Sequence, residues 1–187
     1  MTIWNIARAC KGHLAVPAGK HTGTCPAAGM AVIRGYSGKE AAGIVIDSRK
    51  VEPGDIFVAI RGERVDGHQF IREVFDKGAI AVVCEEEPEE LPGPCIRVED
   101  SLAALRQIAA FYREQMPIPI VGITGSVGKT STKEFVASVL AQKYKTHKTQ
   151  GNFNNEIGVP LTLLAMPEDT EAGQIQGFLE HYTGSMV

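Results

Sequence analysis

The sequence predicts an α/β fold: a small N-terminal α/β domain followed by a second α/β domain built around a phosphate-binding loop. Along most of the 187 residues, short apolar runs alternate with segments whose apolar residues recur at helical spacing. One apolar run leads directly into closely spaced glycines and then into a helix-forming segment. Asp100 and Ser101 are suited to cap the helix that precedes this loop, so we expect domains of residues 1–98 and 99–187.

Each expected element follows from its periodicity and from the residues that bound it. The wholly apolar run from Ile56 to Ile60 is typical of a strand in a sheet covered on both faces. Residues 13–39 show no clear period and predict loops with at most short strands. The expected strands are residues 43–46, 56–60, 79–84, 95–98, 118–123 and 144–148. The expected helices are residues 3–10, 69–77, 102–115, 130–143 and 156–165.

The composition is that of a globular protein and narrows the classes of partner. The formal net charge of −3 leaves no basic surplus for a nucleic-acid partner. No apolar run reaches the roughly 18 to 20 residues of a membrane span, and the N-terminus lacks signal-peptide features, so we expect a cytoplasmic protein. The four cysteines show no CxxC pair, which favours reduced thiols over a structural zinc site. We also expect a monomer.

The glycine-rich loop predicts a site for nucleotide phosphates. Gly125 and Gly128 can adopt backbone angles that turn successive N–H groups toward an anion, at the positive end of a helix dipole. Lys129 can reach the outer phosphates, and the Thr130 hydroxyl can bind Mg²⁺. The spacing departs from the common pattern, because Ile123 occupies the place of its first glycine. The predicted nucleotide-binding residues are Gly125, Ser126, Val127, Gly128, Lys129, Thr130 and Ser131.

Two other interpretations of this loop are open from the residues alone. It can be a plain glycine turn whose lysine is a solvated surface charge. It can also belong to an unrelated P-loop kinase or ATPase, but such a protein needs an acidic residue at the end of a later apolar strand. The residues that follow the loop contain no convincing candidate for that acid.

Three segments together resemble the Mur ligase family, which couples ATP to amide-bond formation in bacterial cell-wall precursors. They are TGSVGKTS at 124–131, IDSRKVEPGDIFVAIRGERVDGHQF at 46–70 and GNFNNEIGVPLTLL at 151–164. The resemblance runs from about residue 42 to residue 166. The asparagine-rich third segment is most similar to the member that adds D-alanyl-D-alanine to UDP-N-acetylmuramoyl-tripeptide. The sister ligase that adds the third amino acid is the close alternative.

The resemblance implies a reaction and the residues that serve it. ATP, with Mg²⁺, phosphorylates the terminal carboxylate of the UDP-linked peptide, and an amine then attacks the acyl phosphate. Lys129 would be the catalytic cation and Thr130 the magnesium ligand. The implied contacts to the UDP part are Ile46, Ser48, Arg49, Glu63, Arg64 and Val65. Asn152, Asn154 and Asn155 are implied substrate contacts, although asparagines there are equally typical of turns and caps, and His68 is more typical of a turn than of a catalyst.

The C-terminal residues depart from the family pattern. The resemblance implies a strand that ends in a magnesium-binding glutamate, but that position falls at about Gln176, and Gly173 and Gly177 are expected to break the strand. Glu180 and His181 are candidate displaced ligands. We therefore expect the tail after about residue 169 to be foreign to the family, and the second domain to be truncated. The chain would then not catalyse by itself, and a non-catalytic module that binds UDP-sugar-peptide is the alternative function.

Overall fold

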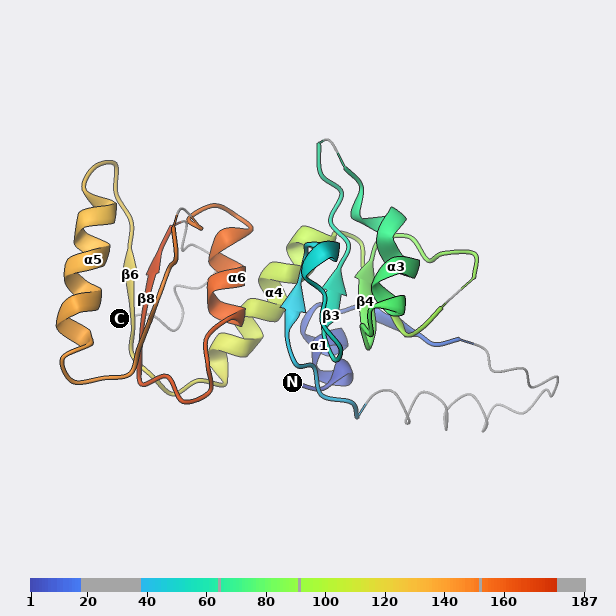
Figure 1. Cartoon of the computed structure of the whole chain (residues 1–187), viewed down its shortest axis with the longest axis horizontal. Coiled ribbons are helices and arrows are strands. Elements are labelled where there is room, and N and C mark those ends of the chain that lie inside the picture. The colour runs from blue at the N-terminus through green and yellow to red at the C-terminus, as the bar shows by residue number, and fades with distance from the viewer. Residues whose placement is uncertain (18–37, 64, 91, 152, 178–187) are drawn as a thin grey trace. The chain divides into compact units, whose positions relative to one another are not determined.

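The computed structural model describes residues 1–17, 38–63, 65–90, 92–151 and 153–177 and confirms a mixed α/β fold with parallel sheets (Figure 1). The chain divides into two compact units, unit 1 with residues 1–105 and unit 2 with residues 106–187. The division falls within helix α4 (Ser101–Glu114), whereas the sequence placed a boundary just before that helix. The assignment of residues 1–98 and 99–187 to two functional domains stays a prediction.

Unit 1 is built on a five-stranded sheet with the order β1-β5-β4-β3-β2. Strands β2 to β5 run parallel, and β1 pairs with β5 in the antiparallel sense. The strands are β1 (His13–Ala15), β2 (Ile44–Val45), β3 (Ile56–Val58), β4 (Ala81–Cys84) and β5 (Cys95–Arg97). The helices are α1 (Ile3–Ala9), η1 (Ser48–Lys50), η2 (Gly67–Phe70) and α3 (Ile71–Asp76).

The core of unit 1 forms where α3 covers one face of this sheet. Ile71 and Val74 of α3 belong to one buried cluster with Phe57 of β3 and Val82 of β4. Every residue of β3 and β4 is fully buried, as the apolar run at 56–60 predicted for a sheet covered on both faces. The chain direction is the same in β2, β3 and β4, so their carboxyl ends lie at one edge. Loops that follow these strands therefore gather at that edge.

Unit 2 contains a three-stranded parallel sheet with the order β6-β8-β7. Its elements are β6 (Ile120–Ile123), α5 (Lys129–Leu140), β7 (Thr146–Lys148), α6 (Gly158–Leu164) and β8 (Ala172–Gln176), together with residues 106–114 of α4. A buried cluster joins α4, β6, α6 and β8 and includes Ala109, Ile120, Leu163 and Ile175. Tyr112 of α4 also donates a hydrogen bond to the carbonyl of Met166 over 2.8 Å.

The expectation that Gly173 breaks the strand after residue 169 is wrong, because β8 runs through it. Gly173 lies within β8, opposite Ile120 of β6, and a Cβ at this position would meet the Ile120 side chain at 3.0 Å. Glycine therefore fits where β6 and β8 approach closely. Gly177, with φ of +145°, follows directly after the strand. None of the helices in the described ranges is both long and apolar enough to cross a bilayer.

Candidate functional site

The glycine-rich loop connects β6 to α5, as the sequence predicted. Gly125 has φ of +137° and Gly128 has φ of +79°, which are backbone conformations that side chains with a Cβ rarely adopt. A Cβ added at either glycine would meet no atom within 4 Å, so it is the backbone conformation rather than crowding that requires glycine. Gly128 is also the residue that precedes the first turn of α5. The loop thus brings backbone N–H groups to a helix N-terminus, the usual arrangement of an anion site.

Lys129 lies across this loop. Its Nζ donates a hydrogen bond to the carbonyl of Gly125 over 2.6 Å, so the charge of the side chain lies beside the turn itself. Gly128 O accepts from both the backbone N–H and the hydroxyl of Thr132, each at 3.0 Å. Val127 is 91% exposed. The loop therefore has a fixed backbone and an accessible outer surface.

Thr130 is the residue at this loop that the sequence predicts as a ligand of Mg²⁺. Thr130 is exposed in the first turn of α5. The strand beside β6 ends at Gln176, which pairs in register with Ile123, the last residue before the loop. Its uncharged amide stands where a phosphate-loop protein commonly has an acidic residue. Among the described residues no group of three or more His, Cys, Asp or Glu side chains could hold a metal, so the fit to Mg²⁺ is incomplete.

The predicted contacts to the UDP part lie in two loops that follow neighbouring strands. Ile46 and Ser48 come just after β2, and the second group follows β3. Since β2 and β3 are parallel, both loops lie at the same edge of the sheet, where ligands commonly bind in open α/β folds. Ser48 is 8% exposed and begins η1, and its carbonyl accepts from Lys77 Nζ at 2.8 Å.

Arg49 is held by an acidic neighbour. Its Nε and Nη2 donate to the two carboxylate oxygens of Asp47, each over 2.8 Å, and its backbone N–H also donates to Asp47. These hydrogen bonds, those of the side chain above all, lower the pKa of Asp47 to about 2. The Arg49 side chain is still 84% exposed. It can therefore present positive charge to a diphosphate only with a carboxylate beside it.

The loop after β3 is a short hairpin, hereafter the hairpin 61–66. Arg61 and Asp66 form an antiparallel bridge, and Gly62 N–H donates to the carbonyl of Val65 over 3.0 Å. Glu63 and Val65 lie at its exposed tip, with Val65 53% exposed. Arg64, the predicted cation at this tip, lies outside the described residues, as do Asn152, Glu180 and His181.

The asparagine-rich loop connects β7 to α6. Asn155 Oδ1 accepts from the backbone N–H of Gly158 over 2.7 Å, which is a cap on the first turn of α6. Lys133 of α5 is almost completely buried, and its Nζ donates to the carbonyl of Gly151 over 3.2 Å. This contact ties the helix of the phosphate loop to the asparagine-rich loop. Asn154 is half-buried, and its role as a substrate contact stays a prediction.

Two features of these sites were missed by the sequence analysis. The first is the link from Lys133 to Gly151, for which helical periodicity around 130–143 gave no signal, since a lysine is expected on the solvated face. The second is the set of contacts made by His68, which the residues alone predict only as a turn residue. Asp66 lies only two residues before His68, but Glu85, whose backbone N–H binds the other side of the ring, lies 17 residues away.

Sequence comparison relates most of the described chain to one family. A sequence model described as "Mur ligase family, catalytic domain" matches residues 40–113, and one described as "Mur ligase middle domain" matches residues 123–175. The second match extends past Asp169, so the expectation that the tail becomes foreign to the family there is wrong up to residue 175.

Named relatives and solved structures agree with these matches. A UDP-N-acetylmuramoyl-tripeptide–D-alanyl-D-alanine ligase of Bacillus subtilis is 40% identical over 94% of this chain and 35% of its own length. The Synechocystis enzyme of the same name is 51% identical over 67% of this chain and 28% of its own length. The crystal structure of MurF from Acinetobacter baumannii matches with a TM-score of 0.76, 30% identity, and coverage of 94% of this chain and 35% of that one.

A further structure bears on the nucleotide. The MurF ligase of Thermotoga maritima, in complex with ADP, matches with a TM-score of 0.66 and 36% identity over 74% of this chain and 32% of its own. The chain thus spans about a third of the length of the relatives that it matches.

Proposed function

This chain belongs to the Mur ligase family, and from that premise we propose that it carries the substrate-holding and phosphate-binding parts of a ligase of peptidoglycan precursor synthesis. The proposed ligase joins D-alanyl-D-alanine to UDP-N-acetylmuramoyl-tripeptide and uses ATP. The names of the relatives at 40% and 51% identity support this choice over the sister ligase that adds the third amino acid. A diaminopimelate ligase structure matches at 18% identity, which supports only a shared fold.

The proposed reaction has two steps. The terminal carboxylate of the tripeptide attacks the γ-phosphorus of ATP, forming an acyl phosphate and releasing ADP. The amino group of D-alanyl-D-alanine then attacks the acyl carbon, and inorganic phosphate leaves. Phosphoryl transfer of this kind depends on positioning and on cations that offset the negative charge of the phosphates.

In this proposal the residues of unit 2 hold the phosphates of ATP. The backbone N–H groups of residues 125–131 surround them, and the Lys129 ammonium offsets the charge of the outer phosphates. The observation that carries the proposal is the phosphate loop itself, with two left-handed glycines between β6 and α5 and Lys129 beside the turn. Mg²⁺ would lower the charge of the nucleotide phosphates when bound, with Thr130 as its one ligand from the described residues.

In the same proposal, unit 1 holds the UDP end of the substrate. The loops after β2 and β3 offer Ile46, Ser48, Arg49, Glu63 and Val65 at one edge of the sheet, and Arg64 would add a second cation. Their shared edge supports this assignment. We expect the purified 187-residue polypeptide to bind both ligands.

Calorimetry with the two ligands tests the proposal. We expect the purified chain to bind both UDP-N-acetylmuramoyl-tripeptide and ATP. The substitution Lys129→Met should weaken the binding of ATP and leave the binding of UDP-N-acetylmuramoyl-tripeptide unchanged. Lys143→Met is the matched control, because Lys143 follows the far end of α5. Release of inorganic phosphate that requires both UDP-tripeptide and D-alanyl-D-alanine would contradict the expected lack of turnover. Absence of binding to either ligand would contradict the proposed function.

A second candidate function is a non-catalytic module that binds the UDP-sugar-peptide. The observation that favours it is Gln176, an amide at the end of the strand beside the phosphate loop. Binding of the UDP-linked substrate without any binding of ATP, in the presence of Mg²⁺, would select this function over the ligase.

A further inference from the structure

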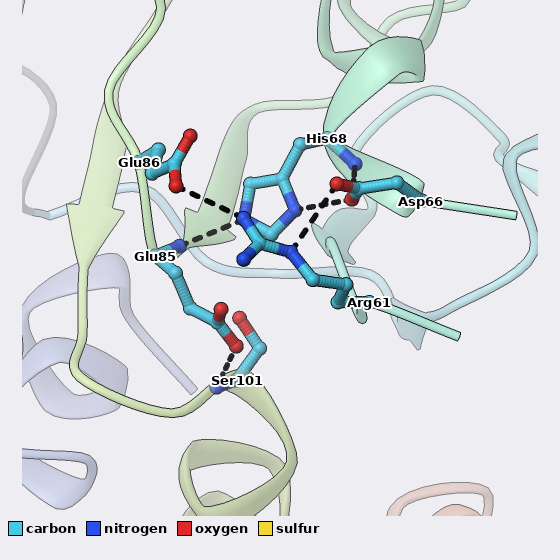
Figure 2. Close-up of polar contacts among 6 residues, drawn as sticks. All are labelled: Arg61, Asp66, His68, Glu85, Glu86 and Ser101. Carbon is cyan, nitrogen blue, oxygen red and sulfur yellow. Dashed lines mark hydrogen bonds and ion pairs between the residues drawn. The ribbon is translucent and has the colours of Figure 1, made fainter. Parts of the chain in front are cut away.

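His68 fastens the hairpin 61–66 to the segment that follows β4 (Figure 2). Its Nδ1 lies 2.7 Å from Oδ1 of Asp66, at the base of the hairpin. On the other side of the ring, the backbone N–H of Glu85 donates to Nε2 over 2.9 Å. The His68 side chain is only 11% exposed. The ring therefore joins two segments that are distant in sequence, and both of its nitrogens are engaged.

These two contacts determine which ring nitrogen carries the proton. A backbone N–H can only donate, so Nε2 accepts from Glu85 and carries no proton in this arrangement. The proton of the neutral ring is then on Nδ1 and is donated to the Asp66 carboxylate. Nδ1 is thus a hydrogen-bond donor and Nε2 an acceptor, so a substitution can remove one of these hydrogen bonds and keep the other.

Asp66 contacts two further donor groups at the base of the hairpin. Its Oδ1 also accepts the backbone N–H of His68 over 2.9 Å, and its Oδ2 pairs with Nε of Arg61 at 3.3 Å. These donors lower the pKa of Asp66, with the backbone N–H of His68 as the largest cause. Arg61 Nη2 in turn pairs with Glu86 at 3.0 Å. Both stems of the hairpin are therefore tied to the segment after β4, as Figure 2 shows.

The tip of the hairpin differs from its base. Val65 is 53% exposed and Glu63 is exposed, whereas the base is held by hydrogen bonds and by the approach of Gly67 to Ile60. A Cβ on Gly67 would come within 2.9 Å of the backbone N and O of Ile60. A loop whose base is fixed before binding loses less conformational entropy on binding a ligand than a loop whose base is mobile.

We propose that His68 is a positioning residue for recognition of the UDP end of the substrate. Through its two ring nitrogens it holds the base of the hairpin 61–66 against the segment after β4, so that Glu63 and Val65 are presented to the ligand from a fixed base. This inference rests on the proposed function, because that function assigns residues 63–65 to the UDP site. His68 itself does not touch the ligand.

Three substitutions separate the two ring contacts. His68→Asn keeps an N–H donor near the place of Nδ1 and loses the acceptor for Glu85. His68→Gln keeps an acceptor near the place of Nε2 and loses the donor to Asp66, and His68→Ala loses both. Gln69→Ala is the matched control, because Gln69 is the next residue and is exposed. The affinity of each variant for UDP-N-acetylmuramoyl-tripeptide and for ATP is measured by calorimetry at 15 °C, alongside its thermal melting.

The expected result is a selective loss of affinity for the UDP-linked substrate. The dissociation constant should rise about tenfold or more in His68→Ala and about three- to tenfold in each single-contact variant. Affinity for ATP should not change. In the wild-type chain, a two-dimensional ¹H–¹⁵N spectrum of the imidazole should show the proton on Nδ1.

Two results would overturn the inference. One is unchanged affinity of all three variants for the UDP-linked substrate, whether or not their melting temperatures fall, since a purely structural role would give that pattern. The other is an imidazole spectrum with the proton on Nε2. Failure of the wild-type chain to bind the UDP-linked substrate is a different outcome, which would overturn the proposed function itself.

Discussion

The two units satisfy their polar groups differently at the edges where ligands are expected. In unit 1, Asp66 and His68 pair with each other and with the segment after β4. In unit 2, Oε1 of Gln176, at the end of β8, is buried and has no hydrogen-bond partner within the described residues. A buried polar group without a partner costs about 1–3 kcal/mol. In unit 1 the base of the hairpin 61–66 is therefore held by hydrogen bonds, whereas in unit 2 a buried oxygen of Gln176, beside the strand of the phosphate loop, has no partner in the described ranges.

The helices of the two units show the same difference. Helix α3 of unit 1 buries Ile71 and Val74 against its sheet. Helix α5 of unit 2 leaves Phe135 and Val139 exposed by 73% and 70%, respectively. Unit 1 should then hold its fold through its own packing, and unit 2 should gain more stability from a bound ligand.

The largest expected effect comes from removing the central side chain of unit 1. Phe57 is fully buried in the core cluster, so Phe57→Ala should lower the free energy of unfolding of unit 1 by about 3–5 kcal/mol. Binding of the UDP-linked substrate should be lost, and binding of ATP kept. The matched control is Phe135→Ala in unit 2, an exposed phenylalanine whose loss should change stability by less than about 0.5 kcal/mol. Equal loss of both ligands in Phe57→Ala would show that the units depend on each other.

A smaller effect is expected from the charge beside the phosphate loop. Lys129→Met removes a charge-assisted contact to phosphate, worth about 1.5–3 kcal/mol, so ATP affinity should fall roughly 10- to 100-fold. The melting temperature without ATP should change little, because the hydrogen bond that Nζ makes within the described part of the chain is a single one, to the carbonyl of Gly125. Titrations of Lys129→Met and of the control Lys143→Met, followed by calorimetry, measure the difference. Equal affinities in the two variants would remove Lys129 from the phosphate site.

A substitution at Gln176 tests whether a carboxylate at the end of β8 makes nucleotide binding by unit 2 depend on Mg²⁺. Gln176→Glu places a carboxylate opposite Ile123, beside the phosphate loop, so added Mg²⁺ should improve ATP affinity about two- to tenfold more than in the parent chain. Without nucleotide and metal, the variant should melt at a lower temperature, because the new charge is buried. Gln174→Glu is the control, since it adds a buried charge in the middle of the same strand. The same Mg²⁺ dependence in Gln176→Glu as in the parent would argue against a metal site at this edge.

The phosphate loop was predictable from the sequence, because glycine at 125 and 128 reports directly on the backbone conformation. Strand β8 was not, because three of its five buried residues are two glutamines and a glycine, instead of the apolar run typical of a parallel strand. The loops after β2 and β3 followed from the expected strands, but the hydrogen bonds that hold these loops did not. Asp47 binds Arg49 two residues away, whereas the partner of His68 comes from a neighbouring strand end and has no local signal.

The smallest expected effect is a dependence of unit 2 stability on pH. Burial lowers the pKa of His147, and the hydrogen bond from Nε2 to the carbonyl of Thr162, 3.1 Å long, only partly offsets this. The folded state then binds fewer protons than the unfolded state, whose histidine titrates near 6.5. The stability contributed by neutral His147 should be complete above about pH 6.5 and should be lost as pH falls through the lower folded pKa. Urea unfolding of the parent chain and of His147→Gln at pH 7.5 and 5 measures the contribution of His147 to the free energy of unfolding. His13→Gln in unit 1 is the control. If the difference between the parent and His147→Gln is the same at both pH values, His147 does not contribute to the acid sensitivity of unit 2.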